Sequence, residues 1–194
     1  KYPALNPVKL PKIERFTMAN GIRVLLVEDH ELPTFSAQAY IPGGEFRDPA
    51  NKAGLAGITM AAMRTGGTKE TTGDQIDEQL EGVAASVESN IGETAATVSF
   101  SALKESADPV MNTFRDILTA PEFREDKIDL AKTQLRGSIA RRNDEGDDIA
   151  AREFSSIVYG RDNAYGWTME YEHLERITRA DLVAFHRRYF FPAN

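Results

Sequence analysis

The order in which strand patterns and helix patterns follow one another is the feature that most constrains the fold of this chain. The strand patterns all lie before residue 103, and four of the six helix patterns lie after it. Strands that come first and helices that come later are typical of proteins whose helices cover one face of an antiparallel sheet. We therefore predict the α+β class, with a mostly antiparallel sheet packed against several helices.

The strand patterns form two hairpins and one single strand. Asn20-Gly21 favours a tight type I′ turn, because that turn requires two successive residues with positive φ. Each pattern combines β-branched or aromatic residues with turn residues at its ends. The first predicted hairpin consists of residues 15–21, which end in this turn, followed by 22–27. The other predicted strands are 35–41, and 85–89 and 94–102, which flank a second turn at residues 90–92.

The helix patterns place apolar residues at helical spacing. Gly66-Gly67 is expected to end the first helix, and capping-box patterns at Thr72 and Thr178 begin the second and the last. Gly160 is expected to end the fifth. The apolar residues predicted to face inward are Leu55, Ile58, Thr59, Ala62 and Met63; Ile76, Leu80 and Val83; Ala107, Val110, Met111, Phe114 and Ile117; Ile128, Ala131, Leu135 and Ile139; Phe154, Ile157 and Val158; and Leu182, Val183, Phe185 and Tyr189.

Composition excludes several classes of function. The formal net charge of −7 argues against a partner held through nucleic-acid phosphates. The chain contains no cysteine, so it has neither disulfides nor thiolate metal ligands. No apolar run reaches the length of about 20 residues that spans a bilayer. We predict no nucleic-acid partner, no membrane span and no cofactor.

The three histidines do not form a helical metal site. They are His30, His173 and His186, and no two of them are four residues apart. A catalytic zinc ion needs about three protein ligands that converge on a tetrahedral site. His30 lies in a polar turn, His173 lies among glutamates, and His186 lies beside two arginines. We therefore expect these residues to have ordinary structural or surface roles.

Two charged clusters have simple explanations. The acidic run 143–148 lacks the ligand spacing of an EF-hand and is expected to be a solvated turn between helices. Arg136, Arg141 and Arg142 are expected to lie on an exposed helix face.

Several fragments in order are similar to the insulinase/pitrilysin family of zinc peptidases, of the inverzincin type, which includes the mitochondrial processing peptidase and its bacterial homologues. The resemblance covers nearly the whole chain from about Ile13. Each fragment alone is weak, whereas their order and spacing together are specific. The fragments are Phe16–Asp29, Gly54–Ala56, Arg64–Thr68, Ala140–Asp144, Ala151–Phe154, Tyr159-Gly160 and Ile177–Phe190.

The same resemblance shows that the metal motif is absent. Family members carry His-x-x-Glu-His on one helix, where two histidines bind zinc and the glutamate activates water. The matching positions here are Gly57, Met60 and Ala61. The third ligand, a glutamate on a later helix, corresponds to Gly137 or Ser138, and an auxiliary acid falls near Ala131. The resemblance therefore implies no catalytic residue and no metal ligand at Gly57, Met60, Ala61 or Ser138.

The resemblance also implies a domain organisation. Residues 1–12 are expected to be an extended, proline-rich lead-in, and residues 13–194 an N-terminal domain that is incomplete at its C-terminal end. Because the sequence begins with Lys1, we expect that something upstream was removed. The trimmed start and the proline-rich lead-in favour a periplasmic or extracellular location.

The function that the resemblance implies is non-catalytic. The chain is expected to pair with a zinc-bearing subunit of the same family, in a heterodimer, and to help enclose an unfolded peptide. One alternative is an active zinc metalloendopeptidase with an unrecognised metal site. Another is a structural or assembly protein of the cell envelope.

Overall fold

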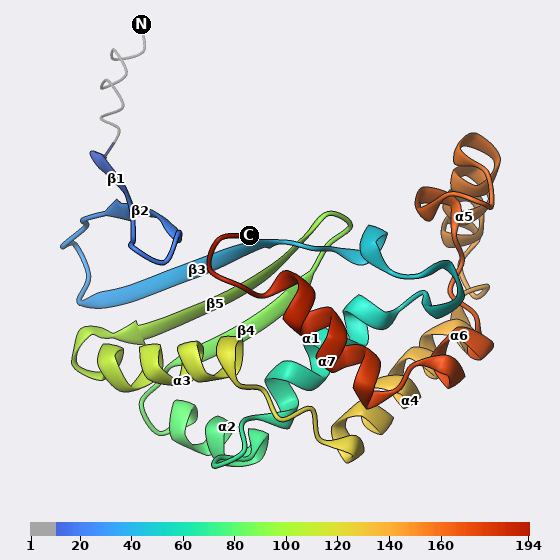
Figure 1. The fold of residues 1–194 in the computed structure, drawn as a ribbon. Coiled ribbons are helices and arrows are strands. Elements are labelled where there is room, and N and C mark those ends of the chain that lie inside the picture. The colour runs from blue at the N-terminus through green and yellow to red at the C-terminus, as the bar shows by residue number, and fades with distance from the viewer. Residues whose placement is uncertain (1–10) are drawn as a thin grey trace, which may run out of the picture. The chain divides into compact units, whose positions relative to one another are not determined.

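The computed structural model describes residues 11–194, so most of the predicted lead-in lies outside the described residues. These residues form seven α-helices and two antiparallel sheets, which confirms the predicted α+β class (Figure 1). The chain divides into two compact units, a hairpin unit up to Pro33 and a main unit from Thr34 onward. The helices are α1 (Leu55–Gly66), α2 (Gly73–Glu81), α3 (Ala107–Thr119), α4 (Glu125–Arg141), α5 (Gly146–Tyr159), α6 (Tyr171–Arg176) and α7 (Arg179–Tyr189).

The hairpin unit pairs β1 (Ile13–Thr17) with β2 (Arg23–Val27). The predicted hairpin is confirmed, but its predicted type I′ turn is wrong. Gly21 has φ +93°, whereas Asn20 does not have positive φ. The Gly21 N–H donates to the Met18 carbonyl at 2.9 Å, and the Met18 N–H donates to the Ile22 carbonyl at 2.8 Å. The connection is longer than two residues, so a single left-handed glycine is sufficient to reverse the chain.

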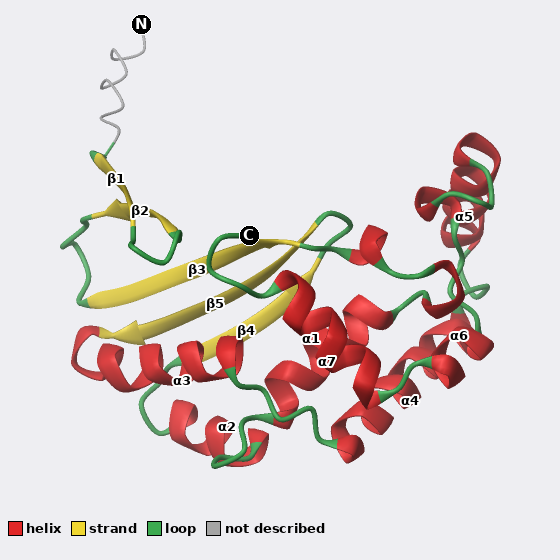
Figure 2. Ribbon diagram, in the orientation of Figure 1, coloured by secondary structure: helices red, strands yellow, loops and turns green. Residues whose placement is uncertain are grey.

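The sheet of the main unit has the order β3-β5-β4, with both pairs antiparallel (Figure 2). Its strands are β3 (Thr34–Pro42), β4 (Ser86–Ile91) and β5 (Ala95–Leu103). Central β5 buries every second side chain, from Ala96 to Ala102, as a strand covered on one face should. Edge strand β3 is paired with β5 residue by residue, yet most of β3 is exposed. The helices therefore cover β5 more completely than β3.

Helix α1 is the centre of the core. It packs against α4, α7 and β4, and Ala56, Ile58, Ala62 and Met63 are fully buried. Gly67, with φ +66°, follows its last residue, and the capping boxes at Thr72 and Thr178 begin α2 and α7, all as predicted. Short 3₁₀ turns occur at η1 (Glu45–Arg47), η2 (Ala50–Lys52), η3 (Lys104–Ser106) and η4 (Ala164–Gly166).

Helix α5 departs from the predicted packing. It ends before Gly160 as expected, but Phe154, Ile157 and Val158 are 66%, 81% and 52% exposed. The prediction that they face inward is wrong. The buried side of α5 instead contains Ser156, whose hydroxyl donates to the Gly166 carbonyl at 3.2 Å. Polar contacts of Arg152 and Ser156, together with the Tyr159–Tyr165 ring contact at 5.1 Å between centroids, hold this side of the helix inward. Val83 and Met111, at 37% and 40% exposed, are also less buried than predicted.

Candidate functional site

The positions of the missing metal motif lie on α1. Gly57 and Ala61 are partly exposed and one helical turn apart, so they share a face. A Cβ at Gly57 would meet no atom within 4 Å, so this face has open space beside it. Met60 is only 2% exposed and belongs to the apolar core. Of the motif positions, Gly57 thus has open space beside it and Met60 is packed among apolar side chains. None of them carries a side-chain donor atom for a metal.

The position that the resemblance assigns to the third ligand lies on α4, which packs directly against α1. Ser138 is exposed there, and its hydroxyl donates to the Gln134 carbonyl of its own helix at 3.3 Å. Ala131, one position of the auxiliary acid, is buried at 6% exposure. The fold therefore brings together the two helices that the resemblance implies, while their side chains at these positions are small, apolar or bonded within the helix.

The histidines lie in three separate elements. His30 follows β2, with its Nε2 atom 4.0 Å from a Glu28 carboxylate oxygen. The Nδ1 atom of His173 accepts the Glu170 N–H at 3.1 Å, which closes the first turn of α6. Within residues 11–194 no group of three or more histidine, aspartate or glutamate side chains is arranged to hold a metal ion.

His186 is buried rather than exposed on the last helix. Its Nε2 atom lies 2.8 Å from the Leu118 carbonyl, and its ring stacks on Phe190 with the centroids 4.9 Å apart. Burial lowers the pKa of His186, although the hydrogen bond to Leu118 opposes this shift. The neutral ring with a proton on Nε2 can donate to this carbonyl, so His186 links α7 to the end of α3.

A buried carboxylate at the start of α1 was not predicted. Asp48 is 6% exposed, and its oxygens accept the N–H groups of Gly54 and Ala56 at 2.8 and 2.9 Å. Burial raises the pKa of Asp48 to about 6, against the lowering effect of these backbone hydrogen bonds. Sequence reasoning missed this cap because the residue adjoining the helix is Gly54, and the capping side chain comes from six residues upstream.

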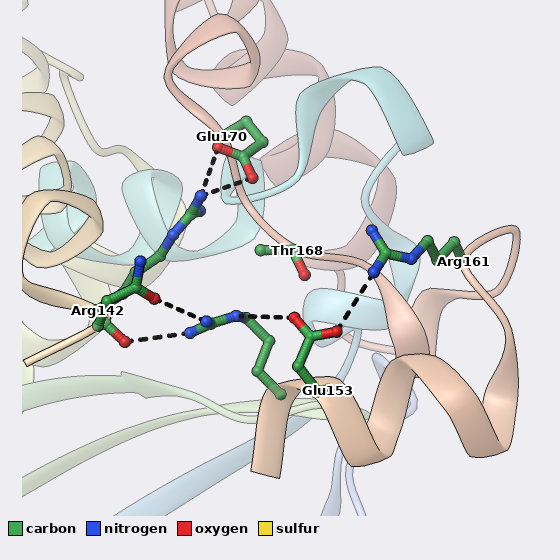
Figure 3. A pocket seen from close by; sticks show the side chains of 7 residues that line it. Arg142, Glu153, Arg161, Thr168 and Glu170 are labelled. Atoms are coloured by element: carbon green, nitrogen blue, oxygen red, sulfur yellow. Dashed lines mark hydrogen bonds and ion pairs between the residues drawn. The ribbon is translucent and has the colours of Figure 1, made fainter. Parts of the chain in front are cut away.

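A polar cavity lies where α4, α5 and the segment before α6 meet. It has a volume of about 280 Å³ and is lined mainly by charged side chains (Figure 3). Arg142 donates to both carboxylate oxygens of Glu170, at 2.9 and 3.0 Å, and to the Met169 carbonyl at 2.9 Å. The predicted cluster of Arg136, Arg141 and Arg142 is therefore divided, because Arg142 turns into this network.

Arg152 joins α5 to the end of α4 in the same network. Its guanidinium donates to the Arg142 carbonyl at 3.1 Å and to Asn143 Oδ1 at 2.8 Å. Arg161 donates to Glu153 at 3.4 Å on the other side of the cavity (Figure 3). Each arginine of the cavity thus has an anionic or carbonyl partner within the protein. The arrangement holds the adjoining segments in place through hydrogen bonds and ion pairs.

The two edges of the main sheet differ. The Val87 carbonyl of β4 accepts a hydrogen bond from Arg64 Nε, and β4 packs against α1 and α3. Within the main unit, edge strand β3 has β5 on one side and no other strand of that unit on the other. Tyr40 of β3 is 67% exposed. An extended segment would therefore find β3 the more accessible edge.

Comparisons with known proteins identify the fold and the family. A structure described as the inactive domain of a peptidase M16 from Pseudomonas fluorescens superimposes with a TM-score of 0.84 at 24% identity, over 90% of this chain and 43% of that one. A structure described as a protease from Helicobacter pylori superimposes with a TM-score of 0.81 at 17% identity, over 95% of this chain and 45% of that one.

A curated relative is similar in sequence as well. A protein described as the non-peptidase homolog YmxG of Helicobacter pylori is 27% identical over 130 residues, which are 66% of this chain and 30% of that protein. The chain thus spans less than half the length of these relatives. None of the helices in residues 11–194 combines the length and apolar character needed to cross a membrane.

The family profile described as insulinase (peptidase family M16) matches residues 23–170. This range includes α1 and α4, and the lack of ligands at the matched positions of these two helices fits a non-catalytic member. The resemblance found in the sequence is thereby confirmed, and the chain belongs to the insulinase family, peptidase family M16.

Proposed function

We propose that this domain is a non-catalytic partner that pairs with a zinc-bearing subunit of the same family and helps to enclose and bind a peptide. The single observation that carries the proposal is helix α1, whose motif positions hold Gly57, Met60 and Ala61 in the place of two ligands and an acid. Relatives described as a non-peptidase homologue and as an inactive domain support the same proposal.

The loss of the site has a physical consequence that favours a scaffold role. An unligated cluster of histidine and glutamate would leave buried polar groups without partners, each at a cost of about 1–3 kcal/mol. Met60 instead packs in the core at 2% exposure. Helix α1 has therefore become an ordinary core helix, while the surrounding fold of the family is kept.

Strand β3 is the proposed place for peptide binding. An extended peptide can add to an exposed sheet edge through main-chain hydrogen bonds. The nine residues of β3 provide such an edge, whereas the Val87 carbonyl of β4 already accepts a hydrogen bond from Arg64. Exposed Tyr40 and Phe35 would provide side-chain contacts on the two faces of the added strand. We further propose a periplasmic or extracellular location, in line with the sequence expectation.

Metal analysis together with reconstitution tests the proposed function. The purified protein is expected to contain far less than one zinc ion per chain and to leave peptides uncleaved. Mixed with a family member that retains His-x-x-Glu-His, it is expected to form a complex and to increase peptide cleavage.

Two results would contradict the proposal in different ways. Near-stoichiometric zinc with chelator-sensitive cleavage by this chain alone would establish an active peptidase. Failure to bind or stimulate zinc-bearing homologues would favour the alternative of a structural or assembly protein of the cell envelope.

A further inference from the structure

Helix α5 turns its apolar face outward. We call Ala150, Ala151, Phe154, Ile157 and Val158 the α5 apolar face, and all five side chains are exposed. The three large ones follow the i, i+3, i+4 spacing of one helix face. Ile157, at 81%, is the most exposed of the chain's large hydrophobic residues in the described part. A helix that packs for its own stability buries this face, so its exposure requires a separate explanation.

Polar contacts prevent α5 from rolling to bury this face. Arg152 and Ser156 lie on the opposite side of the helix, where Arg152 bonds the end of α4 and Ser156 bonds Gly166. Figure 3 shows the same network, with Glu153 of α5 directed toward Arg161. Rotation of α5 by half a turn would break these hydrogen bonds, because it would carry Arg152 and Ser156 away from their carbonyl and amide partners. The fold therefore holds the α5 apolar face in the exposed position.

The size of the surface suits a single helix. The three large side chains expose on the order of 300–400 Å², the size of the largest patches on ordinary monomers. A standard interface between two globular proteins buries about 800 Å² on each partner. A face of one helix, with anchors at i, i+3, i+4 and i+7, matches the smaller area.

The charges around the α5 apolar face indicate that its partner carries positive charge. Residues 143–162 contain six acidic side chains and two arginines, a formal charge of −4. Asp144, Glu145, Asp147 and Asp148 are all exposed at the start of α5. Asp147 also shares a face with Phe154 and Val158, because it lies seven and eleven residues before them. Both arginines already contact groups of the same network.

We propose that the α5 apolar face docks an amphipathic helix of a partner protein whose apolar stripe is flanked by lysine or arginine. Leucine-like anchors would pack between Phe154, Ile157 and Val158, and basic side chains would lie beside Asp147 and Asp148. The proposal is independent of the proposed function, because it requires neither a zinc-bearing subunit nor the edge of β3.

The test uses three synthetic peptides and the whole chain. The first is a labelled leucine-and-lysine peptide designed as an amphipathic helix, the second carries glutamate in place of each lysine, and the third has the composition of the first in scrambled order. Fluorescence anisotropy is expected to show binding of the first peptide at least about tenfold tighter than that of the others. This binding should weaken as salt is added, because exposed charges are screened.

Matched variants locate the site. Ile157→Glu is expected to weaken binding of the first peptide by about tenfold or more, whereas Leu130→Glu, at a 47% exposed position on α4, is expected to leave it unchanged. Asp147→Asn combined with Asp148→Asn should weaken binding and reduce its salt dependence. Circular dichroism checks that each variant keeps its helix content, which is expected because these positions are exposed.

Three outcomes would overturn the proposal. The first is equal affinity for the lysine and glutamate peptides, and the second is unchanged binding by Ile157→Glu. The third is self-association of the wild-type chain that Ile157→Glu abolishes, measured by sedimentation, since it would assign the face to a second copy of this chain.

Discussion

Replacement of Met60 by glutamate restores the acid of the lost metal motif at a position that has become core. The side chain of Met60 is 2% exposed and belongs to the main apolar cluster. Removing a buried methionine loses about 1.5–3 kcal/mol of apolar burial. A carboxyl group in the same place must either lose its hydration as an anion or take up a proton, which adds a further cost of about 1–3 kcal/mol.

We therefore expect Met60→Glu to lower the free energy of unfolding by about 4 kcal/mol at pH 7. Burial would raise the pKa of the new carboxyl group in the folded state above its value in the unfolded chain. The folded state then binds the proton more tightly, so the deficit should shrink as the pH falls toward 4. Urea unfolding followed by circular dichroism, with linear extrapolation to water, measures both the loss at pH 7 and its change with pH.

Gly57→Ala is the matched control on the same helix. A Cβ at Gly57 meets no atom within 4 Å, and alanine favours a helix over glycine by about 0.5–1 kcal/mol. This variant is expected to be more stable than the wild type by that amount. A loss of less than about 1 kcal/mol for Met60→Glu at pH 7 would refute the reasoning, because it would show that the old site still accommodates a polar group.

Three further predictions concern contacts outside the motif. The pKa of Asp48 is about 6 in the folded state, against an ordinary value of 3.8. Protonated Asp48 therefore adds up to about 3 kcal/mol to the free energy of unfolding. This contribution is complete below pH 3.8 and is lost as the pH rises through 6. Asp48→Asn should remove this dependence of the unfolding free energy on pH, as measured by urea titrations at several pH values. Arg152→Ala should speed amide exchange within α5 and leave α1 unchanged, because it removes two bonds that tie α5 to α4. His186→Leu should cost about 1–3 kcal/mol in calorimetry, because the Leu118 carbonyl loses its partner.

Each of these predictions has a contrary result. An unchanged slope between pH 4 and 6 in Asp48→Asn would mean that other groups set the acid response. Amide exchange within α5 that is as slow in Arg152→Ala as in the wild type would mean that the polar network does not hold that helix. Wild-type stability in His186→Leu would mean that water or another donor serves the carbonyl.

Much of the secondary structure could be predicted because its signals are local. Gly66-Gly67 ends α1 through a glycine with positive φ, and the capping box at Thr178 begins α7, as the sequence patterns indicate. The missing ligands at Gly57 and Ala61 are equally local, since side chains without donor atoms cannot bind zinc in any fold. The type I′ turn failed because the loop length, and not the Asn-Gly pair alone, sets the backbone conformation.

What the sequence determined by itself is the class of the fold, the order of its elements and the absence of a helical zinc motif. These follow from residue types and from spacings within a few positions. Only the tertiary structure decided that the apolar face of α5 is exposed, that Asp48 caps α1 and that His186 is buried against Leu118. Such features depend on polar contacts between segments distant in sequence, and hydrophobic periodicity does not record which distant carbonyl or N–H group a polar side chain will meet.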